Sequence, residues 1–234
     1  YSYAVDLSLP GTQLAFNNLR ANGYSVAFVR AYAPDGGGRV DYNAATNVKL
    51  AYAAGLGIEV YGTLSPTSSK AGYMQIDEAL NALQSAGITV RSFWIQVTSP
   101  VNWSSNQNQN VNFIQSAIQR IRARGVRPGV YTSAYDWNQI TNNFSGLGSD
   151  VMLWYWHVYG AGPSGESPAD FNDFRAFGQW TSPMVKQFAQ SESLYGFSSV
   201  NRDVFASNSV SETSAAAVIA ARLQNKITVG LIGL

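Results

Sequence analysis

Residues 90–132, VRSFWIQVTSPVNWSSNQNQNVNFIQSAIQRIRARGVRPGVYT, hold the repeating unit that decides the fold. Val90–Val97 is an apolar run of strand length, and Val111–Arg124 carries apolar side chains at helical spacing. Gly125 ends this helix before a second apolar run, Gly129–Thr132. A strand, a helix and a strand in this order predict two parallel strands joined by a crossover helix.

The same unit recurs toward the N-terminus, and the pattern changes in the second half. Four or five units suit either an open doubly wound sheet or a closed barrel, but no Gly-x-Gly-x-x-Gly motif or P-loop follows the first strand. The later strands lack long helices between them, so we expect an α/β fold, an irregular TIM-like barrel with shortened later helices. The expected strands are Tyr3–Leu7, Ser25–Tyr32, Gly57–Thr63, Val151–Tyr159, Val185–Gln190 and Val204–Phe205, and the expected helices are Thr12–Ala21, Asn43–Ala54 and Met74–Gln84.

The composition limits the chemistry open to the chain. With 234 residues, 46% of them hydrophobic, one barrel domain with a sizeable core is expected. A net charge of +1 argues against a nucleic-acid partner. The sequence contains no apolar run of about 18 residues, so no membrane span is expected. The chain has no Cys and one His, His157, which we expect to be structural. We therefore expect no metal or cofactor, and chemistry carried by carboxylates, amides, hydroxyls and aromatics.

Two features predict an extracellular, secreted protein. Only 12% of the residues are charged, so Ser, Thr, Asn and Gln must supply much of the polar surface. Asn102-Trp103-Ser104 and Asn143-Phe144-Ser145 also match the acceptor pattern for N-glycosylation. Asn102 and Asn143 are therefore expected glycosylation sites.

Two aspartates stand in strands, where carboxylates are uncommon. Asp6 lies near the end of the first expected strand, and Asp203 lies in the last strand-like segment, VNRDVF at 200–205. Closure of a barrel places its first and last strands side by side, and the active site of such a barrel lies at the carboxyl ends of its strands. Asp6 and Asp203 are therefore the candidate catalytic residues. The alternative for Asp6 is a structural role, in which it caps the next loop or pairs with Arg30.

Uncharged polar and aromatic side chains stand at other strand ends. Gln96 and Thr98 alternate along one strand and so share a face, where they either meet the cleft or satisfy loop backbone. Aromatic rings at a barrel mouth offer flat apolar surfaces to sugar rings, although any single ring is more often part of the core. The aromatic candidates for glycan binding are Tyr61, Tyr131, Trp154 and Trp156.

Short motifs across residues 3–205 occur in a specific order: AVDLS at 4–8, VAFVR at 26–30, AAGL at 53–56 leading to VY at 60–61, GVRPGVYTS at 125–133, LW at 153–154, KQF at 186–188 and NRDVF at 201–205. In this order they resemble glycoside hydrolase family 25, the Chalaropsis-type lysozymes, and within it the lysozyme-like proteins of nematodes and amoebae. The resemblance implies a flattened barrel of about eight strands and five helices. It also implies peptidoglycan as partner and cleavage of the β-1,4 bond between N-acetylmuramic acid and N-acetylglucosamine.

The resemblance assigns roles and exposes one departure. Asp6 and Asp203 match two of the family's site carboxylates, and Gln187 of the KQF motif joins the expected substrate-binding residues. The family carries Asp-x-Glu at the end of the fourth strand, with the Glu as proton donor, whereas this chain carries Gln96 and Thr98. An amide and a hydroxyl cannot supply that proton at ordinary pH. Two hypotheses follow: a weak muramidase, or a catalytically silent barrel that serves as a glycan-binding or structural protein.

The chain divides at residue 205 into a barrel domain, 1–205, and a C-terminal extension, 206–234. The extension contains a polar stretch, an Ala-rich run that predicts a helix, and the apolar end Ile227–Leu234. This end either packs as a strand on its own barrel or pairs with a neighbouring copy. The second alternative predicts self-assembly into oligomers or filaments.

Overall fold

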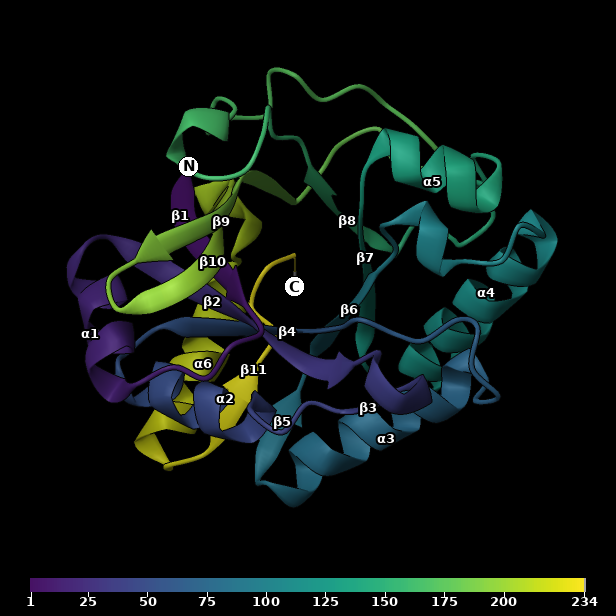
Figure 1. Cartoon of the computed structure of the whole chain (residues 1–234). Helices are drawn as coiled ribbons and strands as arrows, with labels where there is room; N and C mark the ends of the chain where they lie inside the picture. Colours follow the sequence, from purple (N-terminus) through teal and green to yellow (C-terminus); the bar gives the residue numbers. More distant parts are fainter. Residues whose placement is uncertain (234) are drawn as a thin grey trace.

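The first strand closes the sheet on itself. In the computed structural model, which describes residues 1–233 except for the side chains of residues 212–215 and 218, β1 (Ser2–Leu7) pairs in parallel with β2 (Tyr24–Ala33) and antiparallel with β10 (Phe197–Phe205). The ring of strands runs in the order β1-β10-β9-β8-β7-β6-β4-β2, with β3 attached to β2 (Figure 1). The remaining strands are β3 (Arg39–Val40), β4 (Gly57–Gly62), β5 (Ile88–Val90), β6 (Ser92–Gln96), β7 (Arg127–Thr132), β8 (Met152–Trp156), β9 (Val185–Leu194) and β11 (Ile227–Val229).

Within residues 1–233 six helices flank the barrel, and the closed α/β barrel expected from the sequence is confirmed. Five of the helices precede the extension and the sixth belongs to it. Each of the first four crossovers returns the chain to a parallel strand, as the strand pairings show. The helices are α1 (Gln13–Ala21), α2 (Ala44–Ala53), α3 (Gly72–Ser85), α4 (Gln107–Ala123), α5 (Ala134–Thr141) and α6 (Glu212–Leu223).

Three local expectations were wrong in extent. The expected strand Val90–Val97 is two strands, because the chain leaves the small sheet after β5 and enters the barrel at β6. The short strands expected at Val185–Gln190 and Val204–Phe205 are parts of the longer antiparallel pair β9–β10. The sequence analysis also missed α5, which begins after Ser133, whose Oγ accepts the backbone N–H of Asp136 at 3.1 Å.

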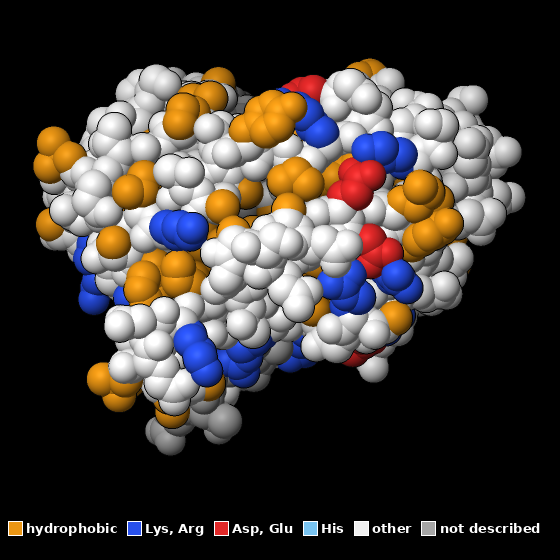
Figure 2. All heavy atoms as spheres, turned by 90° about the horizontal axis from the view of Figure 1, so that it is seen from below, with side chains coloured by type: hydrophobic (Ala, Val, Ile, Leu, Met, Phe, Trp, Pro, Cys, Tyr) orange, Lys and Arg blue, Asp and Glu red, His pale blue; other side chains and the backbone are white. Residues whose placement is uncertain are grey.

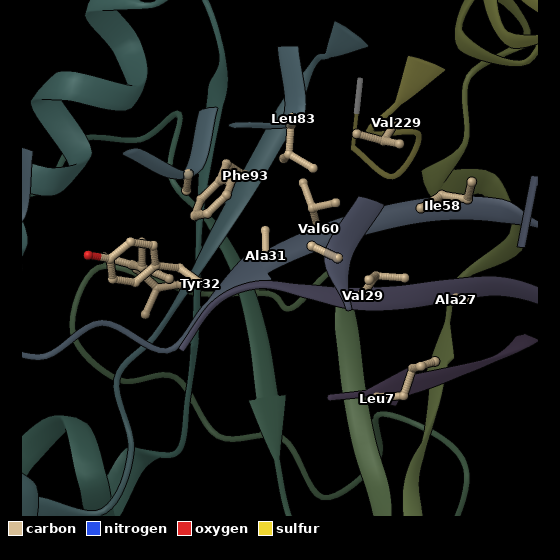
Figure 3. Packing of buried hydrophobic residues seen from close by; sticks show 14 of the residues in the cluster. Leu7, Ala27, Val29, Ala31, Tyr32, Ile58, Val60, Leu83, Phe93 and Val229 are labelled. Atoms are coloured by element: carbon tan, nitrogen blue, oxygen red, sulfur yellow. The ribbon is translucent and has the colours of Figure 1, made fainter. Parts of the chain in front are cut away.

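The core has two layers because side chains of a strand alternate between its faces. Along β4, Ile58 and Val60 join the layer between the barrel and its helices, shown in Figure 3. Tyr61 instead faces the barrel interior, where it meets an aromatic cluster. That inner cluster contains Ala4, Val26, Phe28, Tyr61, Trp94, Tyr131, Met152, Trp154, Val185, Phe205 and Ile232. The candidate site lies above this inner layer.

The surface carries few charges, and many of them are paired. Figure 2 shows the lower face, where most side chains are uncharged and acidic groups lie beside Lys or Arg. Between α3 and α4, Asp77 pairs with Arg120 at 2.6 Å and with Arg124 at 2.7 Å. Within residues 1–233, no helix is both long and apolar enough to cross a membrane.

The C-terminal extension packs on its own barrel. β11 pairs in parallel with β5, residue for residue from Ile227 opposite Ile88 to Val229 opposite Val90. Ile232 is fully buried in the inner cluster. The self-assembly hypothesis needs this apolar segment to be free, and in the structure Ile227–Val229 and Ile232 pack within their own chain, so self-assembly stays a prediction.

Candidate functional site

Two buried carboxyl groups meet inside the barrel. On the antiparallel pair β1–β10, Asp203 lies opposite Ala4 and Asn201 lies opposite Asp6, so the two aspartates share the inward face. Asp6 is 3% exposed and Asp203 is fully buried. Each carboxyl group affects the pKa of the other, so the two groups act as one pair. The strands that the sequence analysis expected to be neighbours are neighbours, and closure of the barrel is the reason.

One oxygen of each carboxyl, Oδ1, accepts a hydrogen bond of ordinary length. The Nδ2 of Asn201 donates to Oδ1 of Asp6 at 3.0 Å, and the indole Nε1 of Trp154 donates to Oδ1 of Asp203 at 2.9 Å. The Oδ2 atoms of both aspartates are buried and meet no donor within the described part of the chain. A buried carboxyl oxygen without a donor favours the protonated form of the group.

Burial and mutual repulsion place protons on this pair. Burial raises the pKa of Asp6 to about 7, against the hydrogen bonds from Asn201, Tyr61 and Asp203 that lower it. Burial and the charge of Asp6 raise the pKa of Asp203 well above its ordinary value. Asp6 therefore takes up and releases its proton near neutral pH.

Asp6 opens into a cavity, whereas Asp203 lies behind it. The cavity has a volume of about 270 Å³ and is bounded by the ends of β1, β2, β4, β6 and β10. Arg30 reaches the same cavity but pairs with Asp41 at 2.7 Å, so the alternative in which Arg30 pairs with Asp6 is wrong. The side chains that contribute to the wall include Asp6, Arg30, Tyr61, Thr63, Gln96 and Asn201.

Gln96 and Thr98 form a neutral hydrogen-bonded chain at the end of β6. Thr63 Oγ1 donates to Gln96 Oε1 at 2.6 Å, and Gln96 Nε2 donates to Thr98 Oγ1 at 3.0 Å. Gln96 borders the cavity of Asp6 and also a second cavity of about 420 Å³, which Thr98 borders as well. The two cavities share Thr63 and Gln96, so they adjoin along this chain of side chains.

The expected glycan-binding aromatics separate into two groups. Tyr61 borders the cavity of Asp6, and Trp156 borders a third cavity of about 330 Å³ near the ends of β7 and β8. Tyr131, Trp154 and Gln187 are instead buried below the site and border none of these three cavities. The placement of these three side chains therefore favours a supporting role over contact with the substrate.

The buried trio supports the carboxyl pair. The ring of Tyr131 stacks on Trp154, with centroids 4.0 Å apart and an interplanar angle of 17°. The hydroxyl of Tyr131 donates to Oε1 of Gln187, and Trp154 donates to Asp203. Their inward direction follows from strand alternation, but their depth below the mouth depends on the register of neighbouring strands, which the sequence pattern does not specify.

His157 belongs to a polar cluster at the third cavity. Its Nδ1 contacts Oδ2 of Asp173, which also accepts from the buried Nζ of Lys186 at 2.7 Å, while Oδ1 accepts from the hydroxyl of Tyr155 at 2.7 Å. The His157 side chain is 44% exposed and borders the cavity together with Trp156. The expected structural contacts exist, and the ring is also accessible from the mouth.

Sequence reasoning missed two polar residues of this region. Asn201 stands two positions before Asp203 on β10, and strand alternation alone could have placed it on the same face. Asp136, in the first turn of α5, is buried and accepts the indole N–H of Trp156 at 2.9 Å. Burial raises the pKa of Asp136 against hydrogen bonds from Trp156, Ser133 and the backbone of Ser99. Asp136 thereby bridges the walls of the second and third cavities.

The carboxyl pair should make stability depend on pH. The folded chain holds the Asp6 proton up to a pKa of about 7, against an ordinary value of 3.8 for the unfolded chain. Between these values the folded state binds more protons, so the free energy of unfolding falls as pH rises through this window. At 1.36 kcal/mol per pH unit, the loss by pH 8 is roughly 4 kcal/mol.

We therefore expect Asp6→Asn to be more stable than the wild type at pH 8 and nearly equal to it at pH 4. Urea unfolding followed by fluorescence at both pH values measures the difference. A variant that is no more stable at pH 8 would show that the pair does not carry the pH dependence.

Comparison with known proteins gives this arrangement a family context. The family model described as Lysozyme-like protein 1 matches residues 1–188. Lysozyme-like protein 7 of Caenorhabditis elegans is 51% identical over 210 residues, which cover 90% of this chain and 74% of that protein. A probable GH family 25 lysozyme 2 of Dictyostelium discoideum is 36% identical over 185 residues, which cover 79% of this chain and 82% of that protein.

Solved structures share the fold at low sequence identity. The muramidase from Trichobolus zukalii superposes with a TM-score of 0.66 at 19% identity, covering 93% of this chain and 98% of that chain. A family GH25 lysozyme from Aspergillus fumigatus superposes with a TM-score of 0.64 at 15% identity, covering 88% of this chain and 95% of that chain. At these identities the likeness establishes the barrel and not the activity.

Proposed function

Because the chain belongs to the lysozyme-like proteins of glycoside hydrolase family 25, we propose that it binds peptidoglycan-type glycans and hydrolyses their β-1,4 bonds slowly, with Asp6 as the acid. The observation that carries the proposal is the buried Asp6–Asp203 pair, of which Asp6 borders the cavity. A general acid works best when its pKa lies near the working pH, and burial raises the pKa of Asp6 to about 7.

The three cavities suit a chain of sugars better than a single one. The first two adjoin at Thr63 and Gln96, and Asp136 ties Ser99 on the wall of the second to Trp156 on the wall of the third. Polar side chains dominate around Asp6, whereas the rings of Tyr135, Trp156 and Phe174 line the third cavity. Sugars present both hydroxyls and flat C–H faces, which match these two kinds of wall.

In the proposed reaction, the Asp6 carboxyl gives its proton to the glycosidic oxygen as the bond from that oxygen to C1 breaks. The acetamido oxygen of the cleaved sugar closes on C1, and water then opens that ring and returns a proton to Asp6. Asn201 and the Asp203 carboxyl stabilise the ionised Asp6 between the two steps through the hydrogen bonds that lower its pKa. General acid catalysis contributes roughly 10²–10⁴-fold, so one buried acid supports slow turnover.

A second candidate function has its own observation. Thr63, Gln96 and Thr98 bond to one another at the end of β6, so neutral groups fill the place where the family resemblance predicts an acid. This arrangement favours a silent barrel that binds glycan without cutting it.

Two measurements on one preparation separate these functions. Purified peptidoglycan is incubated with the chain at pH 6, and both the loss of turbidity and the protein that sediments with the polymer are followed. The proposal expects sedimentation together with slow clearing and new reducing ends. Sedimentation without new reducing ends would establish the silent barrel. If the protein neither sedimented with the polymer nor released reducing ends, glycan binding itself would be rejected.

We also propose that the protein is secreted and carries a glycan at Asn143 rather than at Asn102. Both side chains are exposed, but Asn102 borders the second cavity, where an attached sugar chain would crowd the entry of a glycan ligand. Expression through a eukaryotic secretory pathway, followed by mass measurement before and after enzymatic deglycosylation, should show one occupied site. Asn143→Gln should abolish the mass change, and a remaining change would place the glycan at Asn102.

A further inference from the structure

Glu59 is a third carboxylate inside the barrel, and the proposed chemistry does not use it. It is fully buried on β4, two residues before Tyr61 on the same inward face. Asp6 and Tyr61 stand at the mouth, whereas Glu59 lies toward the opposite end, where the parallel strands begin. A buried carboxylate is costly unless it is well hydrogen-bonded, so its partners define its role.

Both oxygens of Glu59 are saturated with donors. Oε1 accepts the backbone N–H groups of Leu231 and Ile232, the second at 2.8 Å. Oε2 accepts from Oγ of Ser92 at 2.8 Å and from the indole Nε1 of Trp94 at 2.9 Å. One carboxylate thus joins the end of the C-terminal extension to an aromatic side chain of the inner cluster.

The terminal segment fits closely beneath the barrel. The N–H of Gly230 donates to the carbonyl of Ile58 at 2.8 Å, and Val229 packs in the outer core layer near Ile58 and Val60 (Figure 3). Gly230 has φ of +92°, and a Cβ there would lie 2.4 Å from the backbone nitrogen of Ser92. The chain therefore needs glycine at this position to reach Glu59.

A continuous line of contacts runs from Glu59 to the carboxyl pair. Trp94 meets Trp154 edge to face, with ring centroids 6.1 Å apart, and Phe28 packs against both rings. Trp94 lies directly on the backbone of Gly129, where an added Cβ would come within 2.2 Å of its ring, so the indole has little freedom to move. Trp154 then donates to Asp203 at 2.9 Å.

We propose that Glu59 is a positioning residue: it holds residues 227–233 as the floor of the barrel and, through Trp94 and Trp154, fixes the carboxyl of Asp203 against Asp6. The importance of that placement for hydrolysis rests on the proposed function, but the placement itself can be tested without any activity. The segment that Glu59 binds lies beyond residues 1–188, which the family model matches. In this proposal the C-terminal extension helps to hold the residues of the site in place.

Glu59→Gln tests the link with little change of shape. An amide presents one oxygen and one NH₂ group, so the NH₂ group must face either the indole N–H of Trp94 or the two backbone N–H groups, donor to donor, whereas the Ser92 hydroxyl can turn to accept. We expect the indole N–H groups of both Trp94 and Trp154 to exchange with solvent at least about tenfold faster than in the wild type. The six tryptophans, labelled with ¹⁵N at the indole, allow this to be followed by NMR, with Trp94→Phe and Trp154→Phe identifying the two signals.

The same spectra contain an internal reference, and two further variants complete the test. Trp137 donates to the carbonyl of Phe144 at 2.8 Å in the outer layer, so its exchange should not change. Arg222→Gln removes the contacts of α6 with the carbonyls of Tyr52 and Leu56 without touching Trp94, and it should leave the signal of Trp154 unmoved. Gly230→Val, which displaces the segment directly, should reproduce the effect of Glu59→Gln.

The outcomes are distinct. Faster exchange at Trp94 and Trp154 with Trp137 unchanged supports the proposal, even if peptidoglycan is never cleaved. Faster exchange at Trp94 alone would overturn it, because the line of contacts would then end before the site. Equal acceleration at Trp137 would mean general loosening of the fold and would overturn it too, as would no change at all.

Discussion

A chain that carries both Gln96→Asp and Thr98→Glu is expected to hydrolyse peptidoglycan roughly 10²–10⁴-fold faster than the wild type. The pair restores the Asp-x-Glu pattern that the family resemblance predicts at the end of β6. Gln96 borders the first two cavities, the first together with Asp6, and Thr98 borders the second. An acid at position 98 would therefore face the cavity that adjoins the one of Asp6.

The expected gain depends on charge and not on side-chain length. Gln96→Asn with Thr98→Gln has the sizes of the acidic pair but no titratable proton, and it should remain at the wild-type rate. The release of reducing ends from purified peptidoglycan measures both variants. A folded acidic variant with the wild-type rate would show that the walls around β6 have diverged beyond these two positions, for example at Thr63, which contacts position 96.

The sequence predicted the barrel well because its signals are local. Apolar runs of strand length, helical spacing and helix-ending glycines recur from Tyr3 to Thr132, and crossovers between parallel strands follow from that order. The second half was harder because antiparallel pairing needs no helix. The strands β9 and β10 extend into solvent as a hairpin whose polar residues weaken the apolar pattern.

The candidate site was predictable in position but not in depth. Asp6 and Asp203 follow from strand ends and barrel closure, and the structure places them together. Trp154 and Tyr131 carry the same aromatic signal as Trp156, yet they are buried and Trp156 borders a cavity. The register of neighbouring strands decides whether a ring lies at the mouth of the barrel or one layer below it, and the sequence pattern does not contain this register. Glu59 also stands in an expected strand, but the sequence does not indicate its role, because its partners Leu231 and Ile232 are 172 and 173 residues away.

Asp6→Asn is expected to abolish hydrolysis, with a loss of roughly 10²–10⁴-fold if the wild type is active. The amide is nearly isosteric and can still meet Asn201 and Asp203, but it has no proton to give to the glycosidic oxygen. Glycan binding should survive, since only one wall group of the cavity changes. The stability of the variant at pH 8 is expected to rise, so unfolding cannot explain a loss of rate there.

Asp136→Asn is the matched control, because Asp136 is also a buried carboxyl near the mouth whose pKa is raised by burial. It does not border the cavity of Asp6, and its substitution should leave most of the rate. The pH profile supplies an independent check. Asp6 must be protonated to act, so the wild-type rate should fall as pH rises through about 7. If Asp136→Asn removed the activity and Asp6→Asn did not, the proton donor would be Asp136, and the buried Asp6–Asp203 pair would be structural.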